Sequence, residues 1–176
     1  KSLAKFGVDT TLISGPTSLK KPENVKVVKV ETAKQMYQET KKILPVDIAV
    51  CAAAITDFTP EKYEEKKIKE NSLNLNLKRN VDILNFLSKN NEQRPKLVVG
   101  FAAETNDLIK FAKEKKNRKN CDWIVANDVS NPEIGFNSEY NAVSIIYNGK
   151  IEKIEKNLKS YIANKLAKKI IENFIQ

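Results

Sequence analysis

Three apolar runs in this sequence end in small and polar residues that can touch a ligand. The runs span residues 47–55, 96–103 and 121–126, and the first polar side chains after or at their ends include Asp57, Glu104, Thr105, Asn127 and Asp128. In open α/β sheets, nucleotides bind in the crevice outside the carboxyl ends of the strands. Small residues let the backbone N–H groups approach a phosphate or a base, and Phe101 offers a ring for stacking. The pattern predicts a ligand site at these strand ends, although any one alanine is equally explained by helix packing on the sheet.

Lysines elsewhere in the chain can supply the charge that a polyphosphate needs. Lys115 and Lys119 are four residues apart, so on one helix face they can converge on one anionic group. Lys67 belongs to a charged loop at residues 61–70. Negative charge develops on pyrophosphate as it leaves, and preorganised cations must neutralise it. Asp57 and Asp82 are candidate partners for a ribose hydroxyl or for a cation held by the phosphates. A lysine run alone is equally typical of a solvated surface.

Several kinds of chemistry lack the residues they require. The chain contains no histidine, which excludes a Ser-His-Asp arrangement, and neither GxxxxGK[ST] nor GxGxxG occurs. Cys51 and Cys121 lie inside apolar runs without a CxxC spacing, so we expect two structural thiols rather than zinc ligands or a disulfide. No metal ligands are assigned from the sequence.

The elements that must position these residues alternate between strand and helix. Strands are predicted at residues 8–14, 25–30, 47–55, 73–77, 96–103 and 121–126, and helices at residues 32–44, 82–89, 106–116 and 160–175. Residues 56–71 are predicted to form a mobile charged loop, and Asn148-Gly149 predicts a hairpin between residues 141–147 and 151–154. This order predicts an α/β, Rossmann-like three-layer domain with a mainly parallel sheet, helices on both faces and an antiparallel C-terminal addition.

Composition restricts the class of protein. The 176 residues, 41% of them apolar, suffice for a single domain over residues 1–176, and no run of about 18 apolar residues predicts a membrane span. Without a signal-peptide pattern, a cytoplasmic protein is expected. The net charge of +9 raises nucleic-acid binding as an alternative, but 22 acidic residues are interspersed with 31 basic ones and no RNA- or DNA-binding motif accompanies them. We therefore expect neither nucleic acid nor membrane as a partner.

Seven short segments resemble one enzyme family, in family order across nearly the whole chain. They lie at residues 12–16, 52–57, 67–69, 78–84, 99–105, 118–120, and 126–129 with 135–138. Together they are similar to bacterial phosphopantothenoylcysteine synthetase, the ligase domain usually fused to a decarboxylase in coenzyme A biosynthesis. The resemblance implies that the carboxylate of 4'-phosphopantothenate attacks the α-phosphate of CTP, giving an acyl-cytidylate and pyrophosphate. Cysteine's amine then displaces CMP to form an amide.

The same resemblance implies cofactors, partners and site residues. Mg²⁺ would accompany CTP, FMN would be needed only by a fused decarboxylase domain upstream, and the family forms homodimers. Lys67 matches a nucleotide-binding position, and its place on a long charged loop independently predicts a catalytic lid that brings charge to the phosphates when substrate is bound. The other implied nucleotide-binding residues are Cys51, Ala52, Ala53, Asp57, Val81, Asp82, Ile83, Leu84, Phe101, Lys115 and Lys119. Val81 departs from the family, which has proline there and hence a more firmly set helix start.

The front of the chain also departs from the family pattern. The first residues read as the last turn of a helix closed by Gly7, whereas the family has an earlier strand, a glycine-containing turn and a segment bearing the catalytic Asn. We therefore expect this chain by itself to retain nucleotide-binding residues without turning over. A Rossmann-type nucleotide-binding module without ligase activity remains the alternative.

Overall fold

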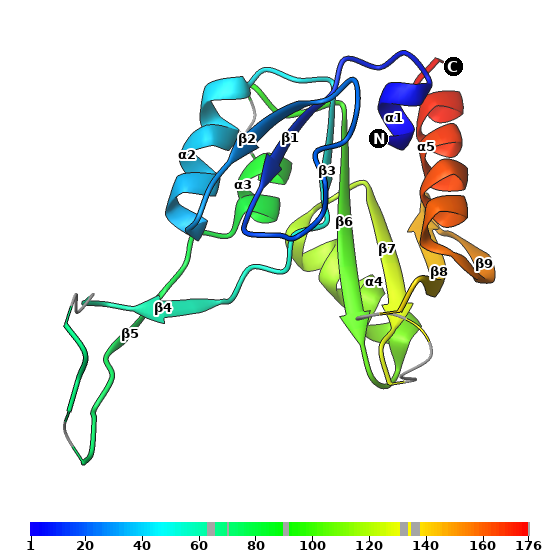
Figure 1. The fold of residues 1–176 in the computed structure, drawn as a ribbon. Helices are drawn as coiled ribbons and strands as arrows, with labels where there is room; N and C mark the ends of the chain where they lie inside the picture. Colours follow the sequence, from blue (N-terminus) through cyan, green and yellow to red (C-terminus); the bar gives the residue numbers. More distant parts are fainter. Residues whose placement is uncertain (63–65, 70, 90–91, 131–133, 135–137, 176) are drawn as a thin grey trace.

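A five-stranded sheet in the order β3-β6-β7-β8-β9 organises this computed structural model, which describes residues 1–62, 66–69, 71–89, 92–130, 134 and 138–175 (Figure 1). The first three strands are parallel, and the last two are antiparallel to their neighbours. Their bounds are β3 Ile48–Cys51, β6 Leu97–Glu104, β7 Trp123–Asp128, β8 Tyr140–Tyr147 and β9 Lys150–Leu158. The predicted parallel sheet with an antiparallel C-terminal addition is confirmed.

Helices cover both faces of this sheet, as predicted. Residues of β6 alternate between two apolar clusters because successive side chains of a strand point to opposite faces. Val98 and Ala102 pack towards α2 (Ala33–Ile43), α3 (Ile83–Lys89) and α4 (Leu108–Lys119). Leu97 and Val99 pack on the other face towards α1 (Ser2–Lys5) and α5 (Lys159–Ile175).

Local signals explain several element ends. Thr32 Oγ1 accepts a hydrogen bond from the Gln35 N–H, and Gln35 Oε1 accepts one from the Thr32 N–H, so a capping box starts α2. Gly7 has φ +80° after α1, which fits the predicted helix end. Asn148 and Gly149 both have positive φ and join β8 to β9, confirming the predicted hairpin, although β9 is longer than expected.

The strand expected at residues 47–55 is shorter and more exposed than predicted. β3 ends at Cys51, its residues are half-buried at most, and Val50 is 37% exposed. A continuous apolar run such as this one is typical of a strand buried on both faces, but β3 pairs with β6 on one side and stands at the end of the five-stranded order. A separate parallel pair, β1 (Thr11–Ser14) and β2 (Lys26–Lys29), precedes it in the chain.

The described residues of 56–80, namely 56–62, 66–69 and 71–80, form a hairpin arm that projects away from the sheet (Figure 1). Its base is a short antiparallel ladder between β4 (Phe58–Pro60) and β5 (Leu77–Arg79). The strand predicted at residues 73–77 therefore begins only at its last residue, because the ladder register pairs Pro60 with Leu77. Part of the loop predicted at residues 56–71 is β4, and residues 63–65 and 70 lie outside the described ranges.

Among the described residues, no helix combines the length and the apolar character that crossing a bilayer requires.

Candidate functional site

Two predicted nucleotide-binding residues meet directly in the structure. Asp82 immediately precedes α3, and its Oδ2 pairs with Nζ of Lys119, the last residue of α4. The two residues are 37 positions apart in the sequence, and the Lys119 side chain is only 19% exposed. The other carboxylate oxygen, Oδ1, accepts the Asn85 N–H at 2.9 Å, which satisfies one of the free donors of the first turn of α3. A fixed cation therefore stands beside a capped helix start.

The charge of Asp82 is stabilised by these contacts. Partial burial opposes ionisation, but the hydrogen bond from Lys119, the backbone N–H of Asn85 and the nearby Lys119 and Arg118 charges outweigh it. They lower the pKa of Asp82 below its ordinary value of 3.8. At neutral pH the pair is therefore a carboxylate with an ammonium, and an anionic ligand would compete with Asp82 for Lys119.

An apolar floor lies next to this ion pair. Cys51 ends β3 opposite Gly100 of β6, and a Cβ on Gly100 would lie 2.8 Å from Leu84 Cδ2 and 3.4 Å from Cys121 Sγ. Burial first, then the proximity of Cys121 and Asp82, raises the pKa of the Cys51 thiol to about 12. Burial likewise raises the pKa of the Cys121 thiol. Both cysteines are free neutral thiols, which agrees with the structural role expected for them.

Further predicted nucleotide-binding residues lie directly after β3, directly before α3, within α3 and on α4. Ala52 and Ala53 are exposed and follow directly on the strand end, so their backbone is accessible to a ligand. Val81 is exposed, whereas Ile83 is buried in the cluster beneath α3. Lys115 lies one helical turn before Lys119 on α4 and is half-buried, so the predicted convergence of two lysines on one helix face fits the helix. We call Cys51, Asp82, Leu84, Gly100 and Lys119 the corner.

Phe101 lies on the opposite face of the sheet from the corner. Its neighbours in β6 fix this placement, since Gly100 faces Leu84 while Phe101 packs against the cluster that also contains Val99 and Trp123. The ring is half-buried there. Its backbone lies within β6, one residue beyond the Cys51–Gly100 pair, but the side chain does not stand beside Asp82 and Lys119.

Asp57 and Lys67 are exposed, and both lie on the arm rather than in the corner. Asn80, which sequence reasoning missed, fastens the base of the arm. Its N–H donates to the Asp57 carbonyl oxygen at 2.8 Å, and its Nδ2 donates to the Thr56 carbonyl oxygen at 2.9 Å. Because Asn80 directly precedes Val81, it keeps the backbone of Asp57 close to the start of the Asp82 segment. Its position at the end of a strand was the available signal.

No metal cage is formed by the part of the chain that the structure describes: no three Cys, Asp or Glu side chains gather there closely enough to hold an ion. Most of the segment at residues 135–138, which contributed to the resemblance, lies outside the described ranges, and only Ser138 is described. Two prominent surface hollows, of about 260 and 190 Å³, lie between β9 and α5 and beside the turn at Gly149. Neither hollow is lined by a predicted nucleotide-binding residue.

Comparison with known proteins supports the family resemblance. Residues 1–174 match the family model described as DNA/pantothenate metabolism flavoprotein C-terminal domain. Over 169 residues, 93% of this chain, the sequence is 37% identical to the Coenzyme A biosynthesis bifunctional protein CoaBC of Borreliella burgdorferi and covers 42% of that protein. The chain thus spans less than half the length of this curated relative.

Solved structures agree with the sequence match. The crystal structure of the C-terminal domain of a Coenzyme A biosynthesis bifunctional protein CoaBC is 28% identical, with a TM-score of 0.78, covering 96% of this chain and 78% of that one. A Cab2 mutant in complex with phosphopantothenate-cysteine is 19% identical, with a TM-score of 0.64, covering 86% of this chain and 53% of that one, and so shares the fold. By sequence and by fold, this chain belongs to the DNA/pantothenate metabolism flavoprotein C-terminal domain family.

Proposed function

We propose that this chain carries nucleotide-binding residues of a coenzyme A biosynthesis ligase that joins 4'-phosphopantothenate to cysteine at the expense of CTP. The observation that carries the proposal is the contact between Asp82 and Lys119. It holds a partly enclosed ammonium group against Asp82, whose charge acts on Cys51 at the end of the parallel strand β3, and the exposed Ala52 and Ala53 follow Cys51 directly. Ligands of open α/β sheets bind at this edge, and the named relatives act in coenzyme A biosynthesis.

The proposed chemistry assigns a task to each part of the site. The phosphopantothenate carboxylate attacks the α-phosphate of CTP, and the bond to the β-phosphate breaks with release of pyrophosphate. Lys115 and Lys119 offset the phosphate charge, and Lys67 approaches from the arm to stabilise the charge that develops as pyrophosphate leaves. The cysteine amine then attacks the acyl carbon, CMP departs with the electron pair of the acyl–oxygen bond, and an amide remains.

A magnesium ion fits this proposal only as a companion of the nucleotide. Mg²⁺ usually takes most of its ligands from phosphates and water, with one or two carboxylates from the protein. The corner supplies Asp82 and the base of the arm supplies the exposed Asp57, so such an ion has candidate carboxylates without a protein cage. The ion would neutralise phosphate charge. FMN has a role only if a decarboxylase domain accompanies this chain.

A homodimer is part of the same proposal. The arm exposes apolar side chains at alternate positions, with Leu73, Leu75 and Leu77 each about half exposed or more. Alternate residues of an extended segment share one face. A second copy of the chain would cover this apolar stripe.

Calorimetry with CTP and with ATP, each with Mg²⁺, tests the nucleotide. We expect CTP to bind more tightly than ATP. Each nucleotide should raise the midpoint of thermal unfolding by mass action, ATP at a higher concentration than CTP. The measurement is made on the 176-residue chain and on the full natural protein that carries it. Absence of CTP binding by both would refute the proposal.

Turnover separates the ligase from the second candidate, a nucleotide-binding module without ligase activity. The placement of Lys67 between β4 and β5, outside the elements that form the corner, is the observation that favours this second candidate. Formation of phosphopantothenoylcysteine from CTP, cysteine and phosphopantothenate by the full natural protein supports the ligase. CTP binding without product supports the module, and turnover by the isolated chain would contradict the expected need for an upstream Asn.

A further inference from the structure

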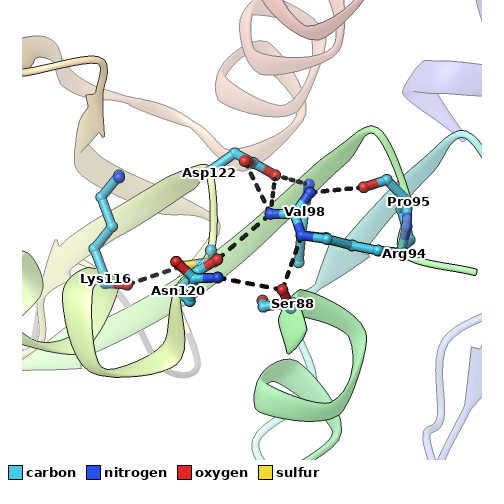
Figure 2. Close-up of polar contacts among 8 residues, drawn as sticks. Ser88, Arg94, Pro95, Val98, Lys116, Asn120 and Asp122 are labelled. Carbon is cyan, nitrogen blue, oxygen red and sulfur yellow. Dashed lines mark hydrogen bonds and ion pairs between the residues drawn. The ribbon is translucent and has the colours of Figure 1, made fainter. Parts of the chain in front are cut away.

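A half-buried polar network centres on Arg94 (Figure 2). Arg94 Nη2 lies 3.0 Å from both carboxylate oxygens of Asp122, while Nε donates to the Ser88 carbonyl oxygen at 2.8 Å and Nη1 to the Pro95 carbonyl oxygen at 2.9 Å. Asp122 Oδ2 also accepts the Val98 N–H at 2.7 Å. One planar guanidinium thus joins acceptors from three segments, which a lysine cannot reproduce.

These contacts hold the ends of two helices together. Ser88 belongs to the last turn of α3, where carbonyl groups lack helical partners, and it accepts from both Arg94 Nε and Asn120 Nδ2. Asn120 is the left-handed cap that ends α4, directly after Lys119. Figure 2 shows Ser88 and Asn120 facing each other across the network. The C-terminal ends of α3 and α4 are therefore fixed to one another and to the start of β6.

The opposite end of α3 carries Asp82. The helix has seven residues and so is about 10 Å long, short and stiff enough that fixing its far end restricts its near end. Lys119, the partner of Asp82, is the residue immediately before the fixed Asn120. Both members of the ion pair are thus attached to elements that the Arg94 network connects.

We propose that Arg94 and Asp122 are positioning residues for the nucleotide site, acting through the placement of Asp82 against Lys119. The inference rests on the proposed function in that the bound group is taken to be the phosphate of a nucleotide. Ser88 supports close packing at this point, since its Oγ is buried without a hydrogen-bond partner among the described residues. Packing this close around the last turn of α3 leaves the helix little freedom to shift on its own.

A nearby ion pair at the protein surface provides a contrast to the Arg94 network. Lys96, two residues from Arg94, lies 3.1 Å from Asp47, but their side chains are 74% and 65% exposed. Exposed pairs of this kind contribute little and position nothing. Lys96→Met is therefore the matched control for Arg94→Met, and Asp122→Asn is a milder variant that retains an oxygen for the Val98 N–H.

The first measurement needs no nucleotide. Carboxyl NMR titration of the free chain is expected to show the pKa of Asp82 moving up towards its ordinary value in Arg94→Met and Asp122→Asn, because Lys119 no longer holds its place, and unchanged in Lys96→Met. Circular dichroism verifies that each variant is folded. A pKa of Asp82 unchanged in both folded variants would overturn the proposal, whether or not CTP binds.

The second measurement is a double-mutant cycle on CTP affinity in the full natural protein. We expect Arg94→Met to raise the CTP dissociation constant about tenfold in the natural background and less than about twofold when Lys119 is already alanine. Equal effects in both backgrounds would mean that Arg94 does not act through Lys119. Failure of the unmodified protein to bind CTP would refute the proposed function and leave the NMR result to decide this inference.

Discussion

The corner and the arm both carry predicted site residues, but only the corner holds its residues in place. In the corner, Asp82 and Lys119 contact each other across 37 positions of sequence, above a floor made by Cys51, Leu84 and Gly100. In the arm, Lys67 is exposed beyond a ladder in which each strand has only three residues. The corner is therefore formed by packing within the chain, whereas the described part of the arm is held by the contacts at its base.

This difference separates binding from catalysis. A residue held by packing can contribute to ground-state binding as soon as a ligand arrives, because folding has already fixed its position. Lys67 contributes only when the arm closes over the nucleotide, and such closure commonly completes a catalytic site. Substitutions in the two regions should accordingly change different measured quantities.

Lys67→Ala should have the largest effect, and on rate alone. We expect formation of the acyl-cytidylate in single-turnover experiments on the full natural protein to slow by about 10² or more, if the ammonium stabilises charge in the transition state. CTP affinity and the thermal midpoint should hardly change, since the side chain is exposed. Lys62→Ala, also exposed on the arm, is the control. An unchanged single-turnover rate would remove Lys67 from catalysis.

Cys51 tests how well the corner excludes water. Peptide mass spectrometry follows the alkylation of Cys51 separately from that of Cys121 in the unmodified chain, and a pKa of about 12 instead of 9.0 lowers the Cys51 thiolate fraction at pH 8 by about 10³. Greater intrinsic nucleophilicity recovers roughly 20-fold, so iodoacetamide should react about 50-fold more slowly than with an ordinary cysteine. Alkylation at the rate of a free thiol would mean that the corner is open.

The same thiol predicts a pH dependence of stability. Its pKa is higher in the folded state than in the unfolded state, so the folded protein binds the proton more tightly and loses that stabilisation as pH rises from 9.0 towards about 12. Urea unfolding of Cys51→Ala should show a weaker decline over this range than the unmodified chain.

Lys119→Ala should reduce affinity rather than rate. A hydrogen bond to a charged group contributes about 1.5–3 kcal/mol, so we expect the CTP dissociation constant to rise about tenfold or more. Lys113→Ala lies on the same helix but is exposed, and lines the hollow near Gly149 instead of the corner. Calorimetry measures the CTP dissociation constant of both variants. Equal dissociation constants would mean that the nucleotide phosphates bind elsewhere.

Sequence reasoning recovered the elements better than the directions of their side chains. The parallel strands, the helices and the Asn148-Gly149 hairpin follow from local signals of period and turn chemistry. The face of the sheet on which Phe101 lies does not follow from local signals, because β6 is apolar on both faces and shows no alternation of polar and apolar residues. The register that sends Gly100 towards Leu84 and Phe101 towards the opposite cluster is set by packing against helices distant in sequence.

The corner shows the same limit for the site. The resemblance placed Asp82 and Lys119 among the nucleotide-binding residues, but their mutual contact depends on where α3 and α4 end. Arg94 escaped notice altogether because it lies in a short polar segment before a strand, without a pattern that marks a half-buried guanidinium. Long-range polar networks of this kind need the folded chain to become visible.

Gly100→Ala should give the smallest of these effects, on the stability of the corner. The new methyl group would lie 2.8 Å from Leu84 Cδ2, so the end of that side chain must move, and Cys121 Sγ at 3.4 Å leaves little room behind it. Overpacking of this size costs about 1 kcal/mol or somewhat more when a flexible side chain can yield. Gly15→Ala is the control, because nothing lies within 4 Å of its added methyl group. If urea unfolding showed both variants equally stable, the corner would be as adaptable as the arm, and the separation of a preformed binding region from a closing one would not hold.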